Sequence, residues 1–338
     1  MKMSYRTTRE QQIRAAVLLT FCDPMSAACQ RLEQLSGKEW QRLLTWLDTS
    51  GVALYLYDRL VELNQVNVLP PDVLARLRRN LAENIARTEG MLAELKALHL
   101  AFEGKKLSYV VLKGFSLWPH SVPRPELRSQ LDLDFLIAAK SASVARQILE
   151  SRGYHLRAIS GRSWEFKTAD APGRSLKSLY KDSPSRSVEL HVEDGAAPSG
   201  SLVDRPAQLC IGGSSMPVLS PVDLFLGQGM HCFEHICSEF SRAAHLIEFR
   251  RHVLARYSDL AFWTKLQQIA RHNSRAPFAL GVITLLITRV MGKFAPDALT
   301  SWTVEKLPPR VRLWVDLYGR RAVLTSFPGN KLYLLLQR

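Results

Sequence analysis

A change of hydrophobic period near residue 105 constrains the fold of this 338-residue chain more than any other feature. Pro70 and Pro71 open a segment in which apolar residues recur every three or four positions as far as Phe102. That spacing places them on one face of a helix of about 30 residues, with proline at its start and Gly104 near its end. Residues 107–112 are instead a compact, apolar and β-branched run, which predicts a buried strand. The chain is therefore expected to be an α/β (α+β) protein.

The predicted elements divide the chain into three regions. Residues 1–104 are expected to form an N-terminal helical region, residues 105–200 a small mixed β-sheet, and residues 201–338 a basic, mainly helical C-terminal region. In the middle region Ser141 is expected to cap a helix, and Gly153 to end it in a left-handed conformation. Further strands of this region are predicted at residues 131–137, 164–167, 176–180 and 187–192.

The charge of the chain favours an anionic partner. The net charge is +14, and residues 242–338 hold 16 Lys or Arg against 5 Asp or Glu, a difference of +11. A positive field of this kind attracts nucleotides, nucleic acid or an acidic peptide.

Several features predict a cytoplasmic protein that does not enter a membrane. Residues 1–14 are polar and carry no secretory signal. The most apolar stretch, residues 278–290, is shorter than the roughly 20 residues of a membrane span and is expected to be a buried helix. The five cysteines are few, odd in number and irregularly spaced. They predict no disulfide framework and a reducing compartment.

The candidate chemistry begins with Asp132-Leu133-Asp134 in an otherwise apolar strand. Side chains alternate across a strand, so both aspartates are expected on one face and Leu133 in the core. Two adjacent carboxylates repel each other unless a cation compensates them, and their hard oxygen ligands suit Mg²⁺ or Mn²⁺. Two such ions can activate an attacking oxygen and stabilise a leaving pyrophosphate. The alternative interpretation is an edge strand with a solvated polar face.

Neighbouring residues favour the metal interpretation. Lys113 and Gly114 stand where a strand gives way to a helix, a place where backbone N–H groups can meet a phosphate. Ser116 could add a hydroxyl there, and Arg128 could bind a phosphate oxygen. Glu189 is expected on a strand beside the aspartates, where a third carboxylate would complete the site. His191 shares the face of Glu189.

These segments together resemble a known family. Val111-Leu112-Lys113-Gly114, the run from Arg128 to Leu136, and Glu189-Leu190-His191 are similar to motifs of the bacterial uncharacterised nucleotidyltransferase family, in the polymerase-beta-like nucleotidyltransferase superfamily. The resemblance seen in the sequence extends over most of the chain. It implies that residues 105–200 are the nucleotidyltransferase core. Leu131 stands where members usually have a small residue, and Glu189 where aspartate is common.

The resemblance implies a site and a reaction. Asp132, Asp134 and Glu189 would be catalytic and hold two Mg²⁺ or Mn²⁺ ions, and Lys113, Gly114, Ser116 and Arg128 would bind the nucleotide. The expected reaction is transfer of NMP, from ATP as the default NTP, by in-line attack on the α-phosphorus. The acceptor could be a small molecule, a peptide or RNA, and the basic C-terminal region favours an anionic one. His191, His231 and His235 are expected beside the active site.

Three alternatives stay open. A toxin-like enzyme that adds nucleotides to tRNA also fits the Arg and Asp-x-Asp pattern, and an inactive binding module could keep the same fold. His231-Cys232-Phe233-Glu234-His235 matches the inverted zinc-hydrolase motif His-x-x-Glu-His, with Glu234 as the base and Glu239 or Glu248 as a third ligand.

Overall fold

The chain folds into two compact units. The computed structural model describes residues 8–24, 27–168, 178–183, 185–193, 200–238 and 242–324. One unit, here termed the helical unit, comprises Met1–Arg79 and Gln228–Arg338; the other, the sheet unit, comprises Asn80–Gly227. The regions expected from the sequence change at residues 104 and 200, whereas the units change within α4 (Pro71–Gly104) and within α6 (Pro221–Cys237). Long helices do not stop where one compact unit gives way to the next.

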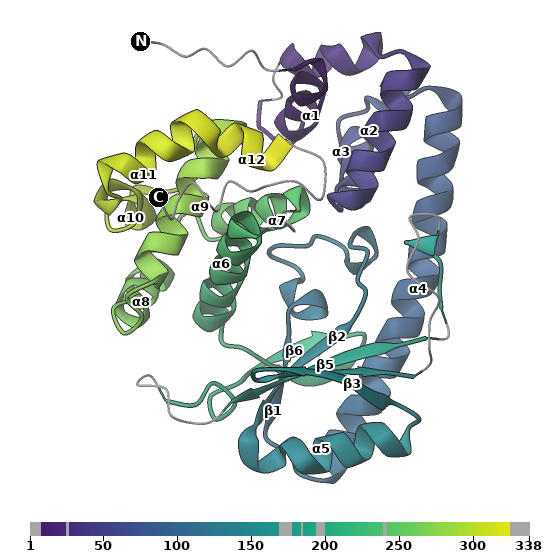
Figure 1. The fold of residues 1–338 in the computed structure, drawn as a ribbon, viewed down its shortest axis with the longest axis vertical. Coiled ribbons are helices and arrows are strands. Elements are labelled where there is room, and N and C mark those ends of the chain that lie inside the picture. The colour runs from purple at the N-terminus through teal and green to yellow at the C-terminus, as the bar shows by residue number, and fades with distance from the viewer. Residues whose placement is uncertain are drawn as a thin grey trace. The chain divides into compact units, whose positions relative to one another are not determined.

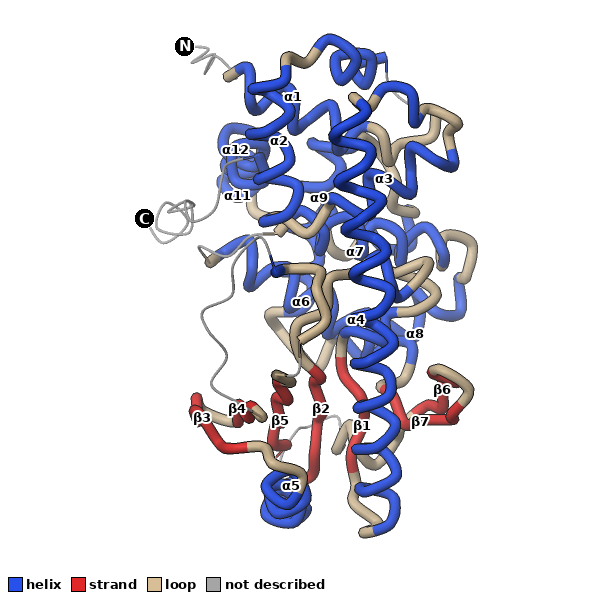
Figure 2. Tube along the Cα trace, turned by 90° about the vertical axis from the view of Figure 1, so that its right-hand side faces the viewer, coloured by secondary structure: helices blue, strands red, loops and turns tan. Residues whose placement is uncertain are grey.

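The described strands of the sheet unit form one mixed, seven-stranded sheet in the order β3-β4-β5-β2-β1-β7-β6 (Figure 2). β2 runs parallel to β5 and β1 parallel to β7, and the other neighbours are antiparallel. The strands are β1 (Tyr109–Leu112), β2 (Leu133–Ala138), β3 (His155–Ser160), β4 (Ser163–Lys167), β5 (Ser187–Glu193), β6 (Ala207–Ile211) and β7 (Ser214–Val218). The α/β class with a mixed sheet is thus confirmed.

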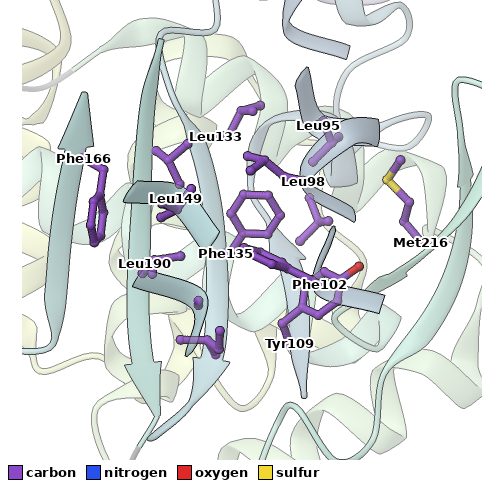
Figure 3. Packing of buried hydrophobic residues seen from close by; sticks show 14 of the residues in the cluster. Leu95, Leu98, Phe102, Tyr109, Leu133, Phe135, Leu149, Phe166, Leu190 and Met216 are labelled. Atoms are coloured by element: carbon purple, nitrogen blue, oxygen red, sulfur yellow. The ribbon is translucent and has the colours of Figure 1, made fainter. Parts of the chain in front are cut away.

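The main core lies between one face of this sheet and two helices. The C-terminal part of α4 and α5 (Ala139–Ser151) lie on the same side of the sheet (Figure 1) and share one buried apolar cluster with it. Phe102 of α4 packs edge-on against Tyr109 and Phe135, with ring centroids 5.1 and 5.3 Å apart (Figure 3). Leu133 and Phe135, two residues apart on β2, both point into this core. Asp134, between them, therefore projects from the opposite face.

Most predicted elements of the sheet unit are confirmed. The long helix is α4, with 34 residues. The predicted run at residues 107–112 contains β1, and the runs at 131–137, 164–167 and 187–192 overlap β2, β4 and β5 to within two residues at each end. The predicted helix is α5, and Gly153 follows it with a φ of 82°. The short helix expected after Gly114 is a 3₁₀ turn, Gly114–Leu117.

Two local predictions in this unit are wrong or lie partly outside the described residues. Ser141 does not cap α5, because the helix begins two residues earlier, after Ala138, and Ser141 is buried within it. A buried Ser side chain inside the first turn cannot serve as the flanking cap residue. Of the strand predicted at residues 176–180, residues 176 and 177 lie outside the described residues, and residues 178–180 are not in a strand.

The helical unit is built from amphipathic and buried helices. α1 and α2 each begin with a capping box, in which the side chains of Thr8 and Ser36 accept hydrogen bonds from the first turn. α9 is buried along most of its length, as expected for residues 278–290. Besides α6, the helices are α1 (Arg9–Leu19), α2 (Gly37–Thr49), α3 (Ala53–Glu62), α7 (Ala243–Ala255), α8 (Leu260–Ala270), α9 (Ala276–Met291), α10 (Asp297–Thr300), α11 (Pro309–Trp314) and α12 (Arg320–Leu324).

Among the residues that the structure describes, no helix combines the length and the apolar character needed to cross a membrane. All five cysteines are free thiols.

Candidate functional site

Two carboxylates meet where β2 and β5 run side by side. Asp134 of β2 is paired in register with Glu189 of β5, and the next pair on this face is Leu136 with His191. Paired residues of neighbouring strands project to the same face of a sheet. Asp134, Glu189 and His191 therefore share the face opposite the main core. On the other side of β2, Asp134 is paired with the last residue of β1, directly before Lys113.

Asp134 is the centre of a small polar cluster, here termed the carboxylate cluster. Lys113 Nζ donates a hydrogen bond to Asp134 Oδ1 at 3.3 Å, and His191 Nε2 lies 3.2 Å from the same oxygen. His191 Nε2 also lies 3.6 Å from Glu189 Oε2. Ser163 of β4 donates its hydroxyl to the other carboxylate oxygen, Glu189 Oε1. Asp134 is buried, at 5% exposure, while Lys113, Glu189 and His191 are half-buried, so the cluster has an accessible side.

Hydrogen bonding inside the cluster shifts the pKa of two groups. The close approach of the His191 imidazole, helped by the hydrogen bond from Ser163 and opposed by burial, lowers the pKa of Glu189 well below its ordinary value. Burial lowers the pKa of His191, but the hydrogen bond to Asp134 and the nearby Glu189 carboxylate outweigh burial and raise this pKa to about 9. The imidazole is therefore protonated at neutral pH and places a positive charge between two carboxylates.

The donor set of the cluster fits a divalent cation. One carboxylate oxygen each of Asp134 and Glu189 and one nitrogen of His191 lie within 4.8 Å of one another. The two carboxylates are the candidate ligands, because a protonated imidazole has no lone pair to offer a cation. Two carboxylates on neighbouring strands repel each other, and in the structure the positive charges of His191 and Lys113 compensate them. A site that already attracts two cationic side chains offers negative charge and carboxylate oxygen atoms to a divalent cation.

The turn after β1 brings Lys113 to the cluster through an uncommon backbone conformation. Lys113 and Gly114 have positive φ angles of 47° and 43°. With a ψ of −154°, Lys113 lies in a sparsely populated region that costs a non-glycine residue about 1–3 kcal/mol, so packing around the turn must hold it in place. A Cβ atom at Gly114 would lie 2.6 Å from Cδ of Gln130. Glycine is thus needed at position 114 for both its φ angle and the close approach of Gln130.

Buried polar side chains of α4 hold the segment that leads into β2. Asn84, fully buried, donates to the carbonyl oxygens of Glu126 and Arg128 at 2.6 and 3.3 Å. Arg87 donates from Nε to the carbonyl of Gln130 at 2.8 Å, and its side chain also donates to the carbonyl of Lys181 at 2.9 Å. These contacts fix the backbone directly before the Asp-x-Asp motif.

Gln130 connects this segment to the turn after β1. Its Nε2 donates to the carbonyl of Asp132 at 2.8 Å while its side chain packs against Gly114. No role for Gln130, Asn84 or Arg87 was predicted from the sequence. The available signal was the presence of Asn84 and Arg87 within an otherwise periodic, partly apolar helix, which indicates buried polar groups with specific partners.

The other predicted residues lie in defined places around the cluster. Asp132 precedes β2, which begins at Leu133, and its side chain is half-buried. Arg128 is half-buried in the segment held by α4. Ser116 is buried, and its hydroxyl donates to the carbonyl of Lys113 at 2.8 Å, an arrangement that stabilises the turn. The contacts of Asp132 and Arg128 with a metal or nucleotide stay predictions.

A cavity of about 560 Å³ opens beside the same turn, within the sheet unit. That volume is typical of small-molecule pockets. Phe115 and Trp118, which directly follow the turn, contribute to its wall, whereas the residues of the carboxylate cluster do not. The full lining comprises Ile85, Thr88, Glu89, Leu92, Phe115, Trp118, Pro125, Glu126, Cys210, Ile211, Gly212 and Gly213.

His231 and His235 belong to the helical unit and lie on α6. Their rings are close to the ring of His245 of α7, for which the sequence predicted no role. Glu234 is exposed and pairs with Arg275 at 3.9 Å. Of the two acids considered as a third zinc ligand, Glu239 lies outside the described residues. Glu248 is buried, and its Oε1 accepts a hydrogen bond from Tyr55 at 2.9 Å.

The fold and the site define a mixed α/β protein whose central sheet presents a carboxylate and imidazole cluster suited to a divalent cation. Comparison with protein families is more specific. The chain belongs to the family described as uncharacterised nucleotidyltransferase, whose profile matches residues 36–290. The resemblance seen in the sequence is thereby confirmed, and a general nucleotidyltransferase role is supported.

Among solved structures, the chain is similar to the crystal structure of an antigenic nucleotidyltransferase-like protein from Paracoccidioides brasiliensis. The two share 15% sequence identity and a TM-score of 0.35, over 64% of this chain and 97% of that one. A comparison with curated proteins found no match.

Proposed function

We propose that this protein is a metal-dependent nucleotidyltransferase that transfers NMP from an NTP, with ATP as the expected donor. The observation that supports the proposal most directly is the in-register pair of Asp134 and Glu189, with Lys113 bonded to the same aspartate. The family supplies the reaction class, and the pair supplies the place where it would occur. The acceptor is a small molecule, a peptide or RNA.

Asp134 and Glu189, with Asp132 beside them in sequence, would hold two Mg²⁺ or Mn²⁺ ions. When bound, such ions supply Lewis-acid activation of the phosphate and neutralise its charge. Lys113, already 3.3 Å from Asp134, is close enough to the cluster to bind a phosphate oxygen of the NTP. Arg128 would bind another, and Gly114 would let the backbone approach the phosphates closely.

The bond changes are those of an in-line displacement. An acceptor oxygen forms a bond to the α-phosphorus as the bond between that phosphorus and the bridging oxygen to the β-phosphate breaks. Pyrophosphate leaves with the electron pair of the broken bond, and the acceptor hydroxyl passes its proton to water. Lys113 and Arg128 would stabilise the negative charge on the departing pyrophosphate. His191 is a positioning residue in this scheme, because it hydrogen-bonds the Asp134 carboxylate and lies beside Glu189.

The test is transfer of label from each NTP carrying a radioactive α-phosphate, in the presence of Mg²⁺. Lysate separated into protein, RNA and small molecules supplies the acceptors. The wild type is compared with Asp134→Asn, and with Asp204→Asn, an exposed aspartate of the same unit, as the matched control. Label in one fraction with the wild type and the control, but not with Asp134→Asn, would support the transferase and identify the acceptor class.

A lack of label in every fraction would leave a missing acceptor as one explanation. Calorimetric titration of the wild type with Mg²⁺ and ATP then decides. Binding that requires the metal and is lost in Asp134→Asn keeps the proposal, whereas absence of metal-dependent binding to any NTP refutes it. If RNA is labelled, its binding should weaken steeply as salt rises, because phosphate contacts release counterions.

A further inference from the structure

Three histidines of the helical unit form a second cluster, here termed the histidine cluster. His231 and His235 are four residues apart on α6, which places them on one face of that helix. His245 is the third residue of α7. The ring centroids of His231 and His235 are 4.3 Å apart. The ring centroid of His245 lies 5.2 Å from that of His231 and 4.7 Å from that of His235. One ligand nitrogen from each residue lies within 4.8 Å of the other two.

The orientation of the rings suits a common ligand. The three pairs of ring planes are inclined at 72°, 54° and 65° rather than stacked face to face. The lone pair of an imidazole nitrogen lies in the ring plane, so rings stacked face to face would direct their lone pairs side by side. Inclined rings can direct them toward a shared point. Three imidazoles this close would also repel each other if all were protonated, and a metal ion relieves that repulsion by binding the neutral forms.

The backbone that carries these ligands is held by packing on both helices. Cys232 and Ile236, which follow His231 and His235 on α6, are buried in the core, as is Leu246 after His245. His245 is itself buried, at 8% exposure, whereas the two α6 histidines are half-buried. The cluster therefore has a rigid inner wall and an accessible outer side, which is the arrangement expected of a preformed metal site with an open position.

We propose that His231, His235 and His245 bind one divalent transition-metal ion of the Zn²⁺ class, which joins α6 to α7. An all-imidazole donor set suits Zn²⁺, Co²⁺ or Ni²⁺ and not Mg²⁺, which prefers oxygen ligands. Three histidines leave a fourth coordination position for water or another ligand. Glu234 is exposed and pairs with Arg275 at 3.9 Å, and in this proposal it has no role as the base of a hydrolase. The proposal is independent of the nucleotidyltransferase activity.

The test uses Co²⁺, whose visible absorption bands report coordination by nitrogen ligands in a site of low coordination number. The full-length chain is freed of metal with a chelator and titrated with Co²⁺. His235→Gln and His245→Gln each remove one ligand. His272→Gln, at an exposed position of the same unit, is the matched control, and Asp134→Asn excludes the carboxylate cluster as the source of the signal. Circular dichroism verifies that each variant is folded.

We expect one equivalent of Co²⁺ with visible bands in the wild type, in His272→Gln and in Asp134→Asn. Mutation of a residue that hydrogen-bonds to a metal ligand lowers metal affinity by up to about 100-fold. Removal of a ligand itself, in His235→Gln or His245→Gln, should lower the affinity for Co²⁺ at least as much. Added Zn²⁺ should displace Co²⁺ and raise the thermal midpoint of the wild type, but not that of His245→Gln. If His245→Gln does not fold, the Co²⁺ titration of His235→Gln, at a half-buried position, tests the proposal instead. Bands that persist in His235→Gln, or no bands in the wild type, would overturn the proposal.

Discussion

Replacement of Arg87 by methionine tests whether α4 positions the Asp-x-Asp segment. Methionine keeps the apolar stem of the side chain and removes the guanidinium group. The change deletes the hydrogen bonds to the carbonyls of Gln130 and Lys181, at 2.8 and 2.9 Å, from a side chain that is 8% exposed. Hydrogen bonds from a charged donor contribute about 1.5–3 kcal/mol each. Methionine has no charged group to desolvate on burial, and this offsets part of the lost hydrogen-bond energy. The net decrease in the local stability of the segment is therefore about 3 kcal/mol.

Amide hydrogen exchange measured by mass spectrometry is the appropriate assay, because it reports the local free energy of opening. A loss of about 3 kcal/mol corresponds to roughly 100-fold faster exchange, and it should be concentrated in residues 126–134. Label transfer should fall as well, since the segment carries Asp132. Arg79→Met, at an exposed position of the same helix, is the control and should exchange like the wild type. Unchanged exchange of residues 126–134 in Arg87→Met would refute the anchoring role of α4.

Two further substitutions test the turn after β1 and the start of α2. Gly114→Ala should lower the free energy of unfolding by at least about 2 kcal/mol in urea titrations, because alanine is strained at a φ of 43° and its Cβ would meet Gln130. Gly104→Ala, where a Cβ would meet nothing within 4 Å, should be neutral or slightly stabilising, and equal effects of both changes would contradict the role given to Gly114. Backbone hydrogen bonding at Ser36, with the side-chain hydrogen bonds of Arg9 and Ser36, lowers the pKa of Glu39 from 4.5 to about 2. The stabilising contribution of Glu39 is therefore complete above pH 4.5 and disappears as the pH falls toward 2. Acid unfolding of the wild type and Glu39→Gln should show a stability difference that shrinks over this window, and a difference independent of pH would count against the capping box.

Much of the sheet unit could be predicted from local patterns in the sequence. The three- and four-residue spacing from Pro71 to Phe102 predicts α4, and apolar runs predict β1, β2 and β5. Alternation along β2 and β5 already places Asp134 on a face away from Leu133, and Glu189 on a face with His191. These predictions succeed because a helix or a buried strand imposes its own period on the residues that it buries.

Other strands gave a weaker signal. β3 is exposed over most of its length, so its side chains show no alternation between a buried and an exposed face. β6 and β7 form a hairpin around Gly212 and Gly213, a glycine pair typical of such turns that the sequence analysis did not use. The helix after Ala138 begins two residues before its predicted cap, and because no side chain caps it, the sequence holds no local signal for its first residue.

The sequence by itself determined the kinds of secondary structure, the positions of the acidic residues within them, and the family to which the chain belongs. Only the tertiary structure paired Asp134 with Glu189, across 55 positions of the chain, and brought Lys113 and His191 to the same carboxylate oxygen. It alone joined His245 to His231 and His235. Periodicity reports which face of an element is buried, whereas strand order and helix packing decide which buried and polar faces meet, and these depend on the free energy of the whole unit.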